Sequence, residues 1–147
     1  MGSSKRIAAL DFGEARIGVA VSDPLRLFAQ GVAVVCASEG WEEELASLLK
    51  RYEVELVLVG VPIREDGQPS HQAAKVLSQA EALIALLPEV RFAFVDERYT
   101  TKLAHSYLRE VGRGMRRAKE LSDMVAAEIL LQEYLDAQRK EGSDGER

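Results

Sequence analysis

The spacing of apolar residues changes once along this chain, from short strand-length runs to runs that alternate with helical spacing. This change limits the folds that the chain can adopt. Three short apolar runs come first, with only turns between them, as in an antiparallel meander. After them, segments with helical spacing alternate with strand-length apolar runs. We therefore expect an α/β fold with a mixed five-stranded sheet, a three-stranded antiparallel meander plus parallel strands, and helices on both faces. The predicted strands are 6–11, 16–21, 31–37, 55–61 and 91–95.

Four helices are predicted between and after these strands. One follows from Trp41, a second is stopped by Pro88, and a third begins near Thr100 and ends before Gly112. The last is expected over 118–137. There is no internal repeat and no linker, so residues 1–147 should form a single domain, with 1–4 and 139–147 flexible.

Composition excludes several classes of protein and of metal site. The formal net charge of −5 argues against a chain coated with basic residues, but it leaves room for a local basic patch. The single cysteine, Cys36, rules out an intramolecular disulfide and a cysteine-based zinc site. No apolar stretch is long enough to span a membrane, and the N-terminus lacks the apolar core of a signal peptide. We expect a cytoplasmic protein without membrane contact.

Asp11 ends the first predicted strand, within the stretch LDFGEARIGVAVSD of residues 10–23. An unpaired carboxylate is costly to bury, so a hydrogen-bond donor, a cation or a metal should lie beside it. Taken alone, Asp11 is better explained as a turn carboxylate that bonds the backbone of the turn after it. We expect Gly13 to supply a turn conformation that other residues resist.

Two further acids, Asp96 and Glu97, end the last predicted strand. Because side chains alternate along a strand, these two must point to opposite faces of the sheet. Glu97 continues the series of Val95, whereas Asp96 continues the series of Phe94. Only one of the two acids can therefore join a shared site easily.

Asp123 is the most informative acid, because it falls on an apolar helical stripe with Ala127 and Leu130. Ala126 and Ala127 are small enough to let this helix approach the sheet closely. If the helix instead begins later than predicted, Ser122 or Asp123 becomes its N-cap, and this alternative stays open.

These acids come from two strand ends and one helix that can meet at one point. Like charges so close would repel one another, and a divalent cation resolves the repulsion. Carboxylate oxygens are ligands of Mg²⁺ and Mn²⁺, so one of these ions is the expected cofactor. The histidines, His71 and His105, have no partner pattern and are interpreted as surface residues.

A basic stretch stands next to the acids. Seven positive residues occur between positions 98 and 119, against one acid, Glu110. A solvated helix face would explain part of this bias, but clustering in a glycine-flanked loop favours phosphate binding. The acids and this loop together are typical of a metal-dependent phosphodiesterase. The positive residues are Arg98, Lys102, Arg109, Arg113, Arg116, Arg117 and Lys119.

Four motifs, in order and spacing, resemble the YqgF/RuvX family: LDFGEARIGVAVSD, VGVPIREDG, VDERYTT and SDMVAAEILLQEYL. The resemblance covers about residues 5–138. It implies a ribonuclease H-like fold and a nuclease that matures the 5′ end of pre-16S rRNA. It also implies that Asp11, Glu97 and Asp123 hold the metal ions, which chooses Glu97 over Asp96.

On this resemblance we expect Asp11 to bridge two metal ions whose shells Glu97 and Asp123 complete. A metal-activated water would attack the phosphodiester in line. RNA is the expected partner, with branched or single-stranded DNA as the alternative. The residues expected to hold nucleic acid are Arg16, Arg98, Arg113, Arg116, Arg117 and Lys119.

The chain also departs from the family pattern, with Glu14 and Ala15 in the first turn and Tyr99 in the third motif. Three rivals to the nuclease prediction follow. One is a Holliday junction resolvase, and another is a catalytically silent RNA-binding factor for ribosome assembly. The third, an ATP-binding protein of the actin and sugar-kinase type, normally needs two such domains, for which 147 residues leave no room.

Overall fold

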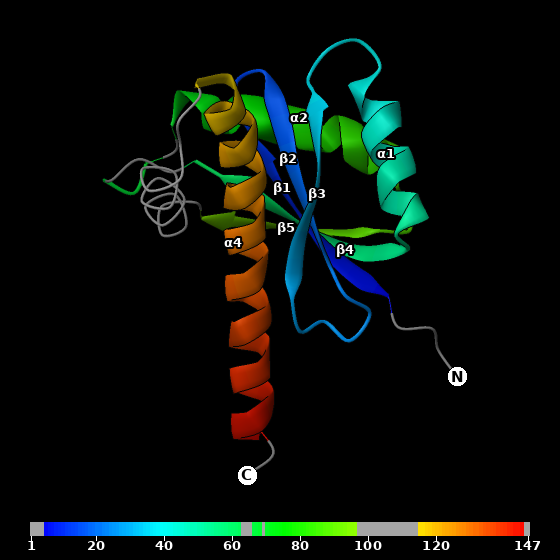
Figure 1. The fold of residues 1–147 in the computed structure, drawn as a ribbon, viewed down its shortest axis with the longest axis vertical. Coiled ribbons are helices and arrows are strands. Elements are labelled where there is room, and N and C mark those ends of the chain that lie inside the picture. Colours follow the sequence, from blue (N-terminus) through cyan, green and yellow to red (C-terminus); the bar gives the residue numbers. More distant parts are fainter. Residues whose placement is uncertain (1–4, 63–65, 69, 97–114, 146–147) are drawn as a thin grey trace.

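The computed structural model describes residues 5–62, 66–68, 70–96 and 115–145, with the backbone alone for 115–122 and 141–145. Five strands form one sheet in the order β3-β2-β1-β4-β5. Helices lie on both faces of this sheet (Figure 1), and the predicted architecture is confirmed. The elements are β1 (Arg6–Phe12), β2 (Arg16–Ser22), β3 (Ala29–Cys36), α1 (Trp41–Arg51), β4 (Val54–Val61), α2 (His71–Leu86), β5 (Arg91–Asp96) and α4 (Met115–Gly145).

Strand direction places the site. β1 pairs antiparallel with β2, and β2 with β3, which is the predicted meander. β1 and β5 each pair with β4 in parallel. The carboxyl ends of β1, β4 and β5 therefore meet at one edge of the sheet, where ligands bind in open α/β sheets.

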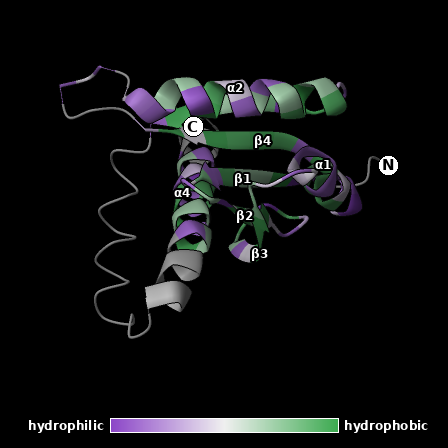
Figure 2. Ribbon diagram, turned by 90° about the horizontal axis from the view of Figure 1, so that it is seen from above, coloured by the Kyte–Doolittle hydropathy of each residue, from purple (hydrophilic) through white to green (hydrophobic). Residues whose placement is uncertain are grey.

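The two faces of the sheet carry two separate cores. Leu10, Val19 and Val59 point toward α1 and α2, whose Leu45 and Leu83 are fully buried against them. On the other face, small residues such as Ala9 and Ala20 pack against α4. Figure 2, seen along a perpendicular direction, shows hydrophobic strands with α1 and α4 on opposite sides of them.

The last helix corrects two predictions. α4 begins at Met115 rather than 118, so the part of the expected basic loop from 115 to 119 is helical. α4 also continues to Gly145, well past the strands in Figure 1, so the predicted helix end at 137 is wrong. The residues at these ends are mostly good helix formers with no proline, and Asp136 pairs with Arg139 one turn on.

Some predicted elements lie outside the described residues: the helix from Thr100 to Gly112, and His105 within it. His71 is exposed at the start of α2, as expected. Among the helices of the described ranges, none is both long and apolar enough to cross a membrane.

Candidate active site

Asp11 lies near the carboxyl end of β1, directly opposite Gly18 of β2. Alternation along the strand gives it the face of Ile7 and Ala9, which is the face that α4 covers. Its side chain is half-buried. The carboxylate thus stands where the α4 face meets the ligand-binding edge of the sheet.

The turn after Asp11 is closed by the backbone itself. The N–H of Gly13 donates to the carbonyl of Arg16 over 2.8 Å. Gly13 does not have a positive φ, so the prediction that it supplies an unusual turn conformation is wrong. Its lack of a side chain serves a different purpose, because a Cβ here would stand 2.8 Å from Oδ1 of Asp123. Gly13 makes room for a carboxylate.

Asp123 lies about two turns inside α4 and is half-buried, so the alternative N-cap role is excluded. The backbone of α4 reaches the sheet at this point, since a Cβ on Gly18 would overlap the carbonyl group of Asp123 and come within 2.7 Å of the nitrogen of Met124. Gly18 is also the cross-strand partner of Asp11. Gly18 therefore contacts both acid-bearing segments, with Asp11 opposite it in the sheet and the backbone of Asp123 packed over it.

Polar side chains of α4 fix the helix along the edge strand β3. Oε1 of Gln132 accepts from the N–H of Ala29 over 2.8 Å, and Nε2 of Gln132 donates to the carbonyl of Leu27 over 3.0 Å. Oε2 of Glu128 accepts from the N–H of Gly31 over 3.0 Å. Because these partners are backbone groups, α4 cannot slide along the sheet without breaking them. We call Glu128 and Gln132 the α4 clamp.

The third predicted ligand, Glu97, follows β5, and the structure describes this strand as far as Asp96. Asp96 pairs with Val61 at the end of β5, so the carboxyl end of this strand lies at the same edge of the sheet as that of β1. Val95 packs in the α4 core, and Phe92 packs against the α1 and α2 core, which agrees with the predicted alternation. Glu97 itself lies outside the described residues.

Within the described ranges, no three His, Cys, Asp or Glu side chains come together. Two of the three predicted ligands, Asp11 and Asp123, belong to those ranges. The donors that they offer are oxygen atoms alone, and the chain's single cysteine, Cys36, is exposed. Oxygen donors are the preferred ligands of Mg²⁺ and Mn²⁺, whereas zinc sites usually include histidine or cysteine.

Basic residues approach this edge from several elements. Alternation puts Arg16, half-buried, on the same face as Gly18 and Asp11. Arg116, Arg117 and Lys119 occupy the first turns of α4, before Asp123, whereas Arg98 and Arg113 lie outside the described residues.

Lys75 is a cation that sequence reasoning missed. It is exposed on α2, and its Nζ lies 3.5 Å from the carbonyl oxygen of Glu14 in the turn after β1. Glu14, one of the departures from the family pattern, therefore sits in a turn that α2 approaches with a positive charge.

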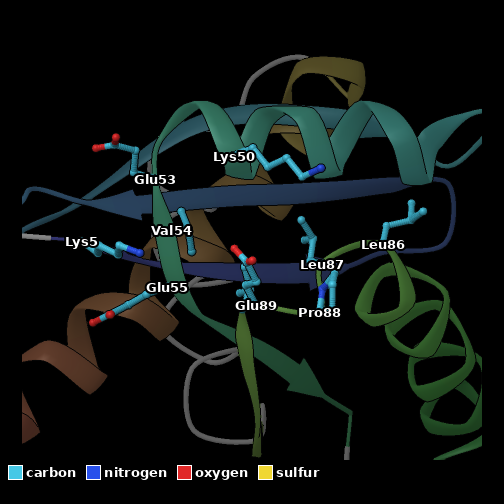
Figure 3. A pocket seen from close by; sticks show the side chains of 10 residues that line it. Lys5, Lys50, Glu53, Val54, Glu55, Leu86, Leu87, Pro88 and Glu89 are labelled. Atoms are coloured by element: carbon cyan, nitrogen blue, oxygen red, sulfur yellow. The ribbon is translucent and has the colours of Figure 1, made fainter.

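The recess drawn in Figure 3 lies elsewhere, at the amino ends of β4 and β5. Lys50 and Glu53 come to it from the end of α1, and Leu86 and Pro88 from the end of α2. None of the predicted site residues lines it. The candidate site at the opposite edge rests on the carboxylates and not on this hollow.

Comparison with known proteins decides the family. The sequence profile of the RuvX family, described as a Holliday junction resolvase, matches residues 5–137. The chain belongs to the RuvX family. A RuvX-family relative from Rubrobacter xylanophilus is 46% identical over 131 residues, covering 89% of this chain and 92% of the relative. One from Syntrophus aciditrophicus is 41% identical over 137 residues, covering 90% and 89%. Both are named "Putative pre-16S rRNA nuclease".

Solved structures agree on the fold of this RuvX-family chain. Thermus thermophilus RuvC superimposes with a TM-score of 0.59 at 16% identity, covering 92% of this chain and 96% of RuvC. Fowlpox virus resolvase, solved with Holliday junction DNA, gives a TM-score of 0.58 at 12% identity, covering 90% and 98%. The ribonuclease H-like fold and the nuclease class predicted from sequence are both confirmed.

Sequence reasoning placed Asp11 and Asp123 on the side of the sheet that α4 covers, but it missed the contacts that hold α4 against the sheet. A glycine inside a strand is disfavoured unless another segment comes close, and this signal was available for Gly18, which α4's backbone approaches, and for Gly31, which its side chains approach. Nothing in the sequence marks Glu128 and Gln132 as different from any solvated pair on a long helix. Their partners, in the hairpin and strand near residue 30, are about a hundred residues away in the chain.

Proposed function

We propose that this RuvX-family protein is a metal-dependent nuclease that cleaves RNA, with the 5′ end of pre-16S rRNA as its substrate. The observation that carries the proposal is the seating of α4 on Gly18, which brings the carboxylate-bearing segment of Asp123 against the strand pair that holds Asp11. The names of the relatives support pre-16S rRNA as the substrate.

Asp11 and Asp123 would hold the cations from the sheet and from α4. Glu97, which follows β5 in the sequence, would be the third ligand, as the family resemblance implies. Bound divalent cations would activate the attacking water and stabilise the leaving oxygen. The chain's own contribution is to fix the two described acids at a set separation, through Gly13, Gly18 and the α4 clamp.

Phosphates on either side of the cleaved bond would be held by Arg16 and by the basic residues around the start of α4. We assign this role to Arg98, Arg113, Arg116, Arg117 and Lys119, as expected from the sequence. Each phosphate contact of this kind releases counterions, so RNA affinity should fall steeply as salt rises.

A cleavage assay tests the proposal. Labelled pre-16S 5′ flank RNA, unrelated single-stranded RNA, duplex DNA and a four-way junction are incubated with the protein in Mg²⁺, Mn²⁺ or EDTA. We expect cleavage of the pre-16S RNA that disappears in EDTA and in both Asp11→Asn and Asp123→Asn. Glu43→Gln, an exposed acid on α1, is the matched control and should cut normally.

The alternatives give different outcomes. Cleavage of the four-way junction in preference to RNA would favour the resolvase that the family description names. RNA binding without any cleavage would favour a silent assembly factor. Cleavage that persists in Asp11→Asn would contradict the proposed site.

A further inference from the structure

A second recess lies on the α4 face, at the end of the sheet opposite Asp11. Its volume is about 450 Å³, within the range of small-ligand pockets. Five segments line it: β1, the loop between β2 and β3, β4, the start of β5, and the second half of α4. No function derived above uses any of its residues.

The base of this recess is apolar. Ile7, Leu56 and Leu135 line it and are buried in the core under α4. Tyr134 lines one wall and is half-buried, and Leu25 on the opposite loop has 72% of its surface exposed. A flat aromatic group would bury apolar surface here and have a ring to stack on.

Three arginines also line the recess: Arg26 from the loop, Arg91 from β5 and Arg139 from α4. Arg26 pairs with Glu55, and Arg139 pairs with Asp136. Arg91 is exposed and has no ion-pair partner in the part of the chain that the structure describes. In a chain with a formal charge of −5, this convergence marks a local preference for an anion.

The loop wall is held in one shape. Oδ1 of Asp23 accepts from the N–H groups of Leu27 and Phe28, each over 2.8 Å. Arg26 sits in the left-handed region, with φ of 60°, and its Nε donates to the carbonyl of Lys5 over 2.9 Å. A non-glycine residue held in this region needs surrounding structure to fix it, and such positions cluster at functional sites.

The recess of Figure 3 serves as a comparison, because it lies at the same end of the sheet on the other face. Its charged lining mixes Lys5 and Lys50 with Glu53, Glu55 and Glu89. Positive and negative groups therefore offset one another there. Of these two recesses, the one under α4 has an apolar base and charged lining residues that are all arginines.

We infer that the recess under α4 binds a nucleoside phosphate, with the base against Tyr134 and the phosphate on Arg91 and Arg139. The unit can come from a free nucleotide or from a strand of bound RNA, and for the second source the inference rests on the proposed function. Tyr134 follows Asp123 by eleven residues of α4, a rise of about 16 Å. An RNA strand cut at Asp11 would therefore reach the recess only if it extends several nucleotides past the cut.

The free-nucleotide arm uses the Asp11→Asn protein in EDTA, titrated with AMP, adenosine and inorganic phosphate and followed by amide NMR shifts. We expect AMP to bind more tightly than either part, with shifts at Leu27 and Arg91. Arg91→Ala should weaken AMP about tenfold, and Tyr134→Leu about fivefold or more. Tyr134→Phe keeps the ring and should bind normally, as should Arg51→Ala, an exposed arginine at the end of α1.

The RNA arm measures binding of short and long single-stranded RNA to Asp11→Asn in Mg²⁺. If bound RNA is the source, Arg91→Ala should weaken the long RNA and leave the short RNA unchanged. If a free nucleotide is the source, AMP binding alone should respond. Either response supports the site.

If neither AMP nor long RNA responds to Arg91→Ala and Tyr134→Leu, the inference is overturned, even where the wild-type protein cleaves RNA normally. Conversely, a protein that cleaves nothing but binds AMP in this recess would overturn the proposed function and leave the inference standing.

Discussion

The two faces of the sheet are built by different means. Toward α1 and α2 the strands present large aliphatic side chains, and residues such as Leu10, Ile17 and Val59 are fully buried. Toward α4 they also present glycine and alanine, so that the helix backbone rests on the sheet at Gly18 and the side chains of Met124 and Glu128 lie close to Gly31. The first face removes much apolar area from water, and the second brings backbones together.

This difference suggests separate roles for the two faces, one in the stability of the fold and the other in the position of the acids. Apolar packing is non-directional and tolerates repacking of similar volume. A helix that touches the sheet backbone and is bonded to it by Glu128 and Gln132 can sit in one place only. We infer that the α1 and α2 face mainly stabilises the chain, whereas the α4 face holds Asp123 beside Asp11.

Gly18→Ala should break the α4 face most severely. The new Cβ would overlap the carbonyl of Asp123, and a helix backbone cannot move aside as a flexible side chain can. We expect nuclease activity to fall about a hundredfold from misplaced acids and stability to fall by about 1–3 kcal/mol. Cleavage rates and urea unfolding measure the two effects. Val19 is the next residue in the strand and points to the opposite face. Val19→Ala should lower stability, but the folded protein should cleave at close to the wild-type rate.

Leu10→Ala tests the opposite face, one residue from Asp11. Removing a fully buried leucine should cost about 3 kcal/mol of unfolding free energy. Because the cavity forms under α1 and α2, the cleavage rate of the folded fraction should stay within about threefold of wild type. A rate loss as large as that of Gly18→Ala would contradict the inference that the α1 and α2 face serves stability and the α4 face positions the acids.

Gln132→Ala should loosen the α4 clamp. It leaves the N–H of Ala29 and the carbonyl of Leu27 without their side-chain partner, at a cost of about 2 kcal/mol. Hydrogen exchange at the Ala29 amide should accelerate. Gln72→Ala, an exposed glutamine on α2, is the matched control and should change neither quantity.

Asp23→Ala gives the smallest effect and depends on pH. The N–H of Phe28, together with that of Leu27, holds the pKa of Asp23 below its ordinary value. A carboxylate with a lowered pKa stabilises the folded state above the unfolded-state pKa, and this contribution is lost as pH falls through the folded-state pKa.

Loss of the two backbone hydrogen bonds to Asp23 should cost about 1 kcal/mol near neutral pH, and the cost should shrink below about pH 4. Urea unfolding of both proteins across this range measures the difference. Asp23→Asn, which keeps a neutral acceptor oxygen, should be less sensitive to pH than wild type. A pH-independent difference between wild type and Asp23→Ala would show that the carboxylate charge plays no part.

The sequence by itself determined the strand order along the chain, the mixed sheet and the faces of Asp11 and Asp123. These follow from periods of two and about 3.6 residues, which local residues set. The ends of α4 were misjudged for the same local reason, since Gly114 and the charged tail look like breaks until the helix-forming residues beside them are weighed.

Only the tertiary structure decided how the acids are held together. Gly13 was expected to bend the chain, but it leaves space for a carboxylate from the last helix, more than a hundred residues later. Gly18, Gly31, Glu128 and Gln132 act through contacts between distant segments, which no local period encodes. Close approach of backbones depends on which segments meet, and that is fixed only when the sheet and α4 pack.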